Sequence, residues 1–160
     1  MIRNISLSML AITLSFMLSC TANLKKEYSA DNRKTLEVKL KTTNYTSGGL
    51  GKAIFVESGE INEVIIYITG MSRDWISRPV HIYTYIYPGT CKSLGEKPAY
   101  EMNETTIMNR VIDNEWKVTK RLPVKLSKLL EGSYAIVIRS TPADENMDLF
   151  CGDIRTYEKR

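Results

Sequence analysis

From residue 35 onward, polar and apolar side chains alternate along several short stretches of the chain. In residues 35–41, which read TLEVKLK, every second residue is apolar, and this period is typical of a half-buried β-strand. Other stretches rich in β-branched and aromatic residues predict further strands. They cover residues 52–57, 63–69, 80–87, 116–126, 133–139 and 149–154. The pattern therefore predicts seven or eight short strands.

Turn-forming residues separate these strands and one helical segment. Pro88 and Gly89 are expected to end the strand over residues 80–87, and Pro123 interrupts the strand over residues 116–126, as suits an edge strand or a bulge. Residues 127–132, SKLLEG, predict a single helical turn between a Ser cap and a terminal Gly. We therefore predict an all-β fold, an antiparallel Greek-key β-sandwich or barrel with one short helical turn.

The N-terminus carries a different pattern. Residues 5–18 are uncharged and rich in Leu, Ile, Met and Phe, and Arg3 precedes them. This apolar run is shorter than the roughly 20 residues that a spanning helix needs. A positive start, a short apolar run and a polar continuation are typical of an export signal.

The run ends in Met17-Leu18-Ser19-Cys20. These residues resemble the lipobox of bacterial lipoproteins, although Met17 stands where Leu is usual. The resemblance implies that Cys20 receives a thioether-linked diacylglycerol, that the chain is cut before it, and that the new N-terminus is acylated by a fatty acid such as palmitate. Two or more acyl chains make a stable membrane anchor. A plain cleaved signal with an incidental Cys remains the alternative.

These features divide the chain into three parts. We expect a lipoprotein signal peptide over residues 1–19, a lipidated Cys and tether over residues 20–34, and a β-domain over residues 35–156. Thr21 follows the Cys where Asp would favour retention in the inner membrane. The resemblance therefore implies an outer-membrane lipoprotein that faces the periplasm.

Composition narrows the possible functions. The 160 residues carry 22 Lys and Arg against 18 Asp and Glu, a net charge of +4, which is too small to predict nucleic-acid binding. A single His makes a His-rich metal site or a Ser-His-Asp triad hard to build. Three Cys are an odd number, so one must have a separate role if the others pair.

Three motifs in the second half of the chain follow one another in the order that is typical of a known family. They are YIYPGTC at 85–91, LLEGSYAIVIR at 129–139 and CGDI at 151–154. Together they are similar to small secreted proteins of the copper/zinc superoxide dismutase fold, including CHRD-like domains, over about half of the chain. The resemblance implies a disulfide between Cys91 and Cys151. Cysteines of an exported domain are expected to pair, and two free thiols are the alternative.

The metal ligands of that family are missing. Tyr85 and Tyr87 stand where the resemblance places two His, and Arg139 stands where it places a third. Copper redox chemistry needs several imidazoles. We therefore predict no dismutase activity, no cofactor and no metal.

The same three positions form the candidate binding surface. If the implied topology holds, Tyr85, Tyr87 and Arg139 lie together, and two Tyr with an Arg have the composition of a protein-interface hot spot. Trp75, in a predicted loop, is a further contact candidate. The alternative is that these side chains fill space left by the lost ligands.

We predict that the protein is not an enzyme but a lipid-anchored envelope protein with a binding or structural role. Its expected partners are the membrane, through the anchor, and an envelope protein. One alternative is copper handling through His81 and soft thioether ligands, which would come from Met71, Met102, Met108 and Met147. Another is inhibition of an exogenous envelope-degrading enzyme.

Overall fold

The computed structural model describes residues 34–43, 49–70, 79–112 and 114–155, all within one unit of the chain, Arg33–Arg160. The strands are β1 (Thr35–Thr42), β2 (Gly51–Ser58), β3 (Ile61–Thr69), β4 (Val80–His81), β5 (Tyr83–Thr90), β6 (Ser93–Leu94), β7 (Tyr100–Glu101), β8 (Ile107–Ile112), β9 (Glu115–Leu122), β10 (Tyr134–Arg139) and β11 (Asp148–Ile154). The helix α1 (Leu126–Glu131) precedes β10, and a 3-10 turn, η2 (Pro142–Asp144), follows it.

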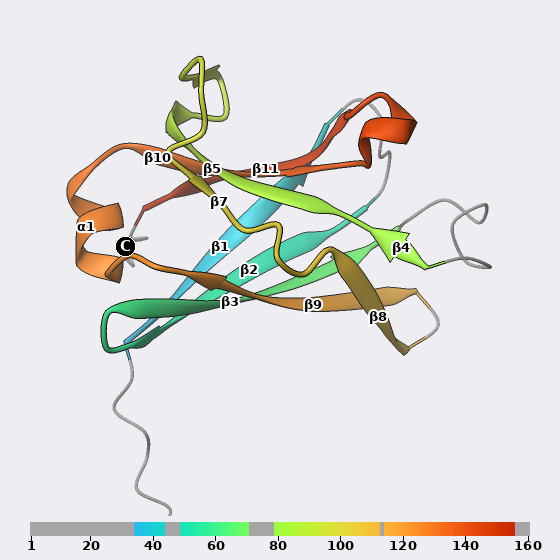
Figure 1. Ribbon diagram of the computed structural model, residues 1–160, viewed down its shortest axis with the longest axis horizontal. Helices are drawn as coiled ribbons and strands as arrows, with labels where there is room; N and C mark the ends of the chain where they lie inside the picture. The colour runs from blue at the N-terminus through green and yellow to red at the C-terminus, as the bar shows by residue number, and fades with distance from the viewer. Residues whose placement is uncertain (1–33, 44–48, 71–78, 113, 156–160) are drawn as a thin grey trace, which may run out of the picture. The chain divides into compact units, whose positions relative to one another are not determined.

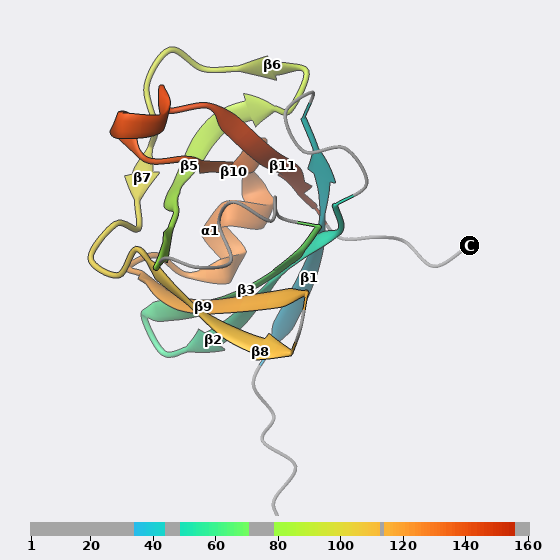
Figure 2. The ribbon, with the colours of Figure 1, turned by 90° about the vertical axis from the view of Figure 1, so that its right-hand side faces the viewer.

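The strands form one antiparallel sheet that curls into a half-barrel (Figure 1, Figure 2). Their order is β4-β8-β9-β3-β2-β1-β11-β10-β5-β6, and β7 pairs with β5. The neighbours β3 and β9, β1 and β11, and β5 and β10 are not consecutive in the chain, so the sheet contains crossovers. Only Ile82 separates β4 from β5 in sequence. Because β4 pairs with β8 and β5 pairs with β10, the segment 80–90 joins the two sides of the curl.

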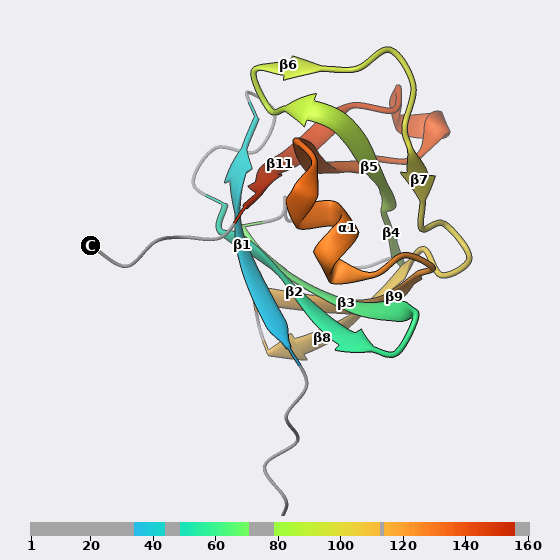
Figure 3. The same cartoon turned by 90° about the vertical axis from the view of Figure 1, so that its left-hand side faces the viewer.

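Apolar side chains fill the inside of the curl. Alternate residues of β1 are buried and exposed, as the sequence pattern predicted, and the buried ones belong to one large core. Phe55 and Phe150 are the largest side chains that are fully buried in it. The helix α1 lies across one open end of the curl (Figure 3) and buries Leu126 and Leu129 against the same core. The curled sheet therefore encloses packed side chains.

The predicted all-β antiparallel class is confirmed, but the strands are more numerous than the seven or eight expected. Three of the eleven, β4, β6 and β7, have only two residues each. The prediction also missed β8, in which five of the six side chains are exposed. A strand with so many exposed side chains has no alternation for a sequence pattern to detect.

The prediction that Pro88 and Gly89 end a strand was wrong, because β5 continues to Thr90. The Gly89 amide donates to Ser133 O over 2.8 Å, and Pro88 O accepts from the Gly95 amide over 2.8 Å. The missing N–H of Pro88 thus removes no bond between β5 and β10. Gly89 has φ of +97°, and a Cβ there would lie 2.2 Å from Ser93 O, across the turn between β5 and β6. Only glycine fits at this turn.

The predicted strand over residues 116–126 and the predicted helix cap also needed correction. Strand β9 ends at Leu122, immediately before Pro123, and α1 begins at Leu126. Lys125 occupies the cap position, with no side-chain cap, so Ser127 lies inside the first turn. Within the described ranges, no helix has the length and apolar character needed to cross a membrane.

Candidate functional site

The outer face of β5, β10 and β11 carries a second, smaller cluster of buried side chains. It consists of Tyr87, Ala135, Val137 and Cys151. The register pairs Tyr85 with Val137 and Tyr87 with Ala135, so these side chains project from the same face of the sheet. Tyr85 is half-buried at the edge of this cluster. These buried side chains make this face of the sheet partly apolar.

Arg139 joins the two predicted tyrosines on that face. Its Nη1 donates to the Tyr87 hydroxyl over 2.9 Å, and its Nε donates to Asp148 Oδ1 over 2.5 Å. The guanidinium carbon lies 5.5 Å from the ring centre of Tyr85 and 5.2 Å from that of Tyr87. The structure thus brings Tyr85, Tyr87 and Arg139 together. We call these three residues with Asp148 the tyrosine–arginine cluster.

The surroundings of Arg139 and Tyr85 raise the pKa of both groups. Burial lowers the pKa of Arg139, but its hydrogen bond and charge interaction with Asp148 prevail, so the pKa lies above the usual value. Burial and the charge of Glu101 raise the pKa of Tyr85. At neutral pH Arg139 therefore presents a charged guanidinium, and the Tyr85 phenol is protonated.

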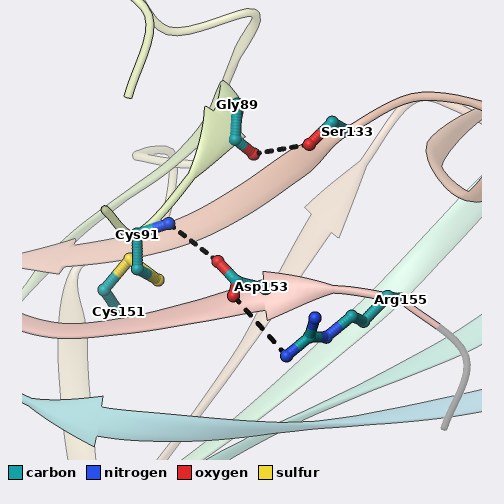
Figure 4. The surroundings of a disulfide bond; sticks show 6 residues. All are labelled: Gly89, Cys91, Ser133, Cys151, Asp153 and Arg155. Atoms are coloured by element: carbon teal, nitrogen blue, oxygen red, sulfur yellow. Dashed lines mark hydrogen bonds and ion pairs between the residues drawn. A yellow bond between two sulfur atoms is a disulfide. The ribbon is translucent and has the colours of Figure 1, made fainter. Parts of the chain in front are cut away.

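A disulfide (Figure 4) joins Cys151 of the small buried cluster to Cys91, which packs against that cluster. Cys91 and Cys151 are bonded, with their Cα atoms 5.8 Å apart, as the family resemblance implied. The Cys91 amide donates to Asp153 Oδ1 over 2.7 Å, and Arg155 Nη2 lies 3.9 Å from Asp153 Oδ2. These contacts fasten the chain after β5 to β11 at the edge of the small cluster.

Three of the predicted functional residues cannot be placed. Cys20, Met71 and Trp75 lie outside the described residues. His81 is described and is half-buried, with Nδ1 3.1 Å from Thr106 Oγ1. Met102 and Met108 are buried in the large core. No group of three or more His, Cys, Asp or Glu side chains suited to a metal occurs in the part of the chain that the structure describes.

Two acidic residues in the segment before Cys151, Asp144 and Asp148, have partners within the protein. Asp144 Oδ2 accepts from the Thr141 hydroxyl over 2.7 Å, and Asp148 pairs with Arg139. Both carboxylates thereby fix the turn between β10 and β11. Asp148 was not expected in the binding surface. Its place there follows from the irregular register at Ile138 and Arg139, where Arg139 pairs with Asp148.

The sequence interpretation also missed Lys120. This side chain points into the curl and is 2% exposed. Its ammonium donates to the carbonyls of Thr105, Met102 and Ile82, over 2.7, 3.0 and 3.4 Å. Burial lowers the pKa of Lys120 to about 8. The alternation of β9, in which Trp116, Val118 and Leu122 are buried, was the available signal.

Lys120 lies at a polar cavity of about 350 Å³. The cavity is also lined by Glu63, Met102, Glu104, Thr105, Thr119 and Arg121. Three carbonyl partners occupy all three donors of an ammonium. Lys120 therefore fastens β9 to the 102–105 segment and to Ile82, where the two sides of the curl meet.

No protein-family profile, no curated protein and no solved structure matches this chain. A function has to be inferred from its own residues.

Proposed function

We propose that this chain is a lipid-anchored envelope protein, held at the periplasmic face of the outer membrane, whose β-domain binds another envelope protein without catalysis. The export signal and the lipobox-like Cys20 support the location. The tyrosine–arginine cluster supports the binding role and is the observation that carries it.

The cluster suits protein recognition because its groups are fixed before a partner arrives. Arg139 is tied at both ends, by Asp148 and by the Tyr87 hydroxyl. Its side chain is 21% exposed, and Tyr85 is half-exposed beside it. A rigid aromatic and guanidinium surface loses little conformational entropy on binding. Tyr and Arg are also enriched among the residues that contribute most to interfaces.

The packed core favours binding of a partner at the surface over binding of a ligand inside the curled sheet. Barrels of about this size either pack their interior with side chains or leave a ligand chamber. Here Phe55, Phe150 and several Ile side chains occupy the inside of the described curl. An exterior face is therefore the better candidate for contact with a partner.

We expect Tyr85→Ala to weaken capture of the partner by roughly 30-fold, the effect of truncating an interface hot spot. The measurement is in-cell cross-linking followed by purification of the anchored protein from the envelope. Ile107→Ala is the control, since Ile107 is an exposed apolar side chain on β8, outside the tyrosine–arginine cluster. A partner lost with Tyr85→Ala and kept with Ile107→Ala supports the proposal. Identical cross-linked products in both variants and the wild type would contradict it and would make the cluster structural filler.

A further inference from the structure

A row of lysines and one tyrosine crosses the outer face of β1, β2, β3 and β9. The register places Lys39 opposite Lys52, Lys52 opposite Tyr67, and Tyr67 opposite Lys117. Residues opposite one another project from the same face, and neighbouring strands lie about 4.8 Å apart. We call these four residues the lysine–tyrosine row.

The positive charges of this row are concentrated around one ring. Lys52 Nζ lies 5.1 Å from the centre of the Tyr67 ring, and Lys117 Nζ lies 5.6 Å from the same centre. Each contact is a cation–π interaction. Like charges that lie opposite one another on adjacent strands are destabilising, and Lys39 and Lys52 form such a pair. Among the described residues, no carboxylate forms an ion pair with any of the three lysines.

Two of the four residues in the neighbouring register row are aliphatic. It contains Glu37, Ile54, Ile65 and Thr119, and the two Ile side chains are half-buried. Glu37 is the only acid in that row, and it is exposed. The face therefore combines ammonium groups, an aromatic ring and aliphatic surface on strands that lie side by side.

We propose that the lysine–tyrosine row docks the domain onto an anionic phospholipid surface. Lysines near such a surface are attracted to the phosphate headgroups, and tyrosine prefers the boundary between apolar and aqueous regions. The choice of a phospholipid surface as the binding partner follows from this charge complementarity and from the place of β1 in the chain. Strand β1 begins at Thr35, directly after the 20–34 segment, which spans at most about 50 Å when fully extended. The row is therefore within reach of the bilayer that holds Cys20, and in this respect the inference rests on the proposed anchor.

The test uses the full-length protein purified from cell envelopes. It is mixed with vesicles of phosphatidylcholine alone or of phosphatidylcholine with phosphatidylglycerol, and the bound protein is recovered by flotation. A water-soluble amine reagent then labels the lysines, and peptide mass spectrometry compares the rates. We expect Lys39, Lys52 and Lys117 to label about five-fold more slowly on the anionic vesicles, the factor that one lysine near such a surface contributes. Lys92 and Lys97, which are exposed in the segment after β5, should label equally on both.

Added salt should remove the protection of the row without any substitution, because exposed charges are screened. Lys52→Glu combined with Lys117→Glu should remove the protection of Lys39, and Lys92→Glu combined with Lys97→Glu should leave it intact. Equal labelling of the row on both kinds of vesicle would overturn the inference, as would equal protection of Lys92 and Lys97. Flotation with the anionic vesicles alone would refute the lipid anchor and leave the row supported. Flotation with both kinds of vesicle, without slower labelling of the row, would support the lipid anchor and refute docking through the row.

Discussion

Replacing both Cys91 and Cys151 by Ala should lower the free energy of unfolding by roughly 4 kcal/mol. The two residues are 60 positions apart in the sequence, and their bond removes the entropy that a loop of this length has in the unfolded chain. A difference of that size is a large part of the roughly 5–15 kcal/mol by which domains are stable. Urea denaturation of the oxidised wild type and the double variant at pH 7 measures it.

Two controls separate the bond from its surroundings. The wild type treated with a reductant should unfold like the double variant. Ser133→Ala, which removes only the exposed 3.2 Å hydrogen bond from Ser133 Oγ to Gly89 O, should cost no more than about 1 kcal/mol. A double variant within about 1 kcal/mol of the oxidised wild type would show that the disulfide contributes little to the stability of the domain.

Between pH 8 and pH 9.5 the free energy of unfolding should rise by about 1.5 kcal/mol. Burial lowers the pKa of Lys120 from 10.5 to about 8, so over this interval the unfolded chain binds more protons than the folded one. Stability therefore increases with pH until the unfolded lysine also loses its proton. Urea denaturation at several pH values gives the slope.

Lys120→Met should abolish this slope, because the titrating group is then absent. Lys128→Met is the matched control, since Lys128 is exposed on α1, and it should retain the full rise. A rise of the same size in Lys120→Met would mean that another group titrates and that Lys120 is not confined as the structure places it.

The strands that form the large core could be predicted from the sequence because each has one buried face. Thr35–Thr42 alternates cleanly, and its pattern required no knowledge of its neighbours. Strand β8 could not be predicted in this way, since it gains its place from pairing with β9 and β4. Pairing is a property of the folded sheet, and a strand whose side chains are mostly exposed leaves little trace in the hydrophobic pattern.

The candidate site was predicted in part. The family resemblance put Tyr85, Tyr87 and Arg139 together, and the structure places them in contact. Asp148 was not predicted, because its pairing with Arg139 depends on an irregular register between β10 and β11. The alternation of β9 places Lys120 on the inward face, but a Lys side chain is usually expected to be exposed. Only the structure shows the three carbonyl oxygens that accept hydrogen bonds from its ammonium.

The two faces proposed to bind lie on different parts of one curled sheet. The tyrosine–arginine cluster is on β5, β10 and β11, and the lysine–tyrosine row is on β1, β2, β3 and β9. Between these groups β1 pairs with β11. A membrane contact through one face is therefore compatible with a protein contact through the other, and each has its own variant, Tyr85→Ala or Lys52→Glu with Lys117→Glu.

The central claim is that the chain is a lipid-anchored envelope protein, and the mass of its mature N-terminal peptide tests this most directly. The protein is isolated from the envelope of cells that make it, digested, and analysed by mass spectrometry. The account predicts a peptide that begins at Cys20 and carries a diacylglycerol and an amide-linked fatty acid, and predicts that Cys20→Ser abolishes this species. A mature chain that begins elsewhere, or an unmodified thiol at Cys20, would contradict it.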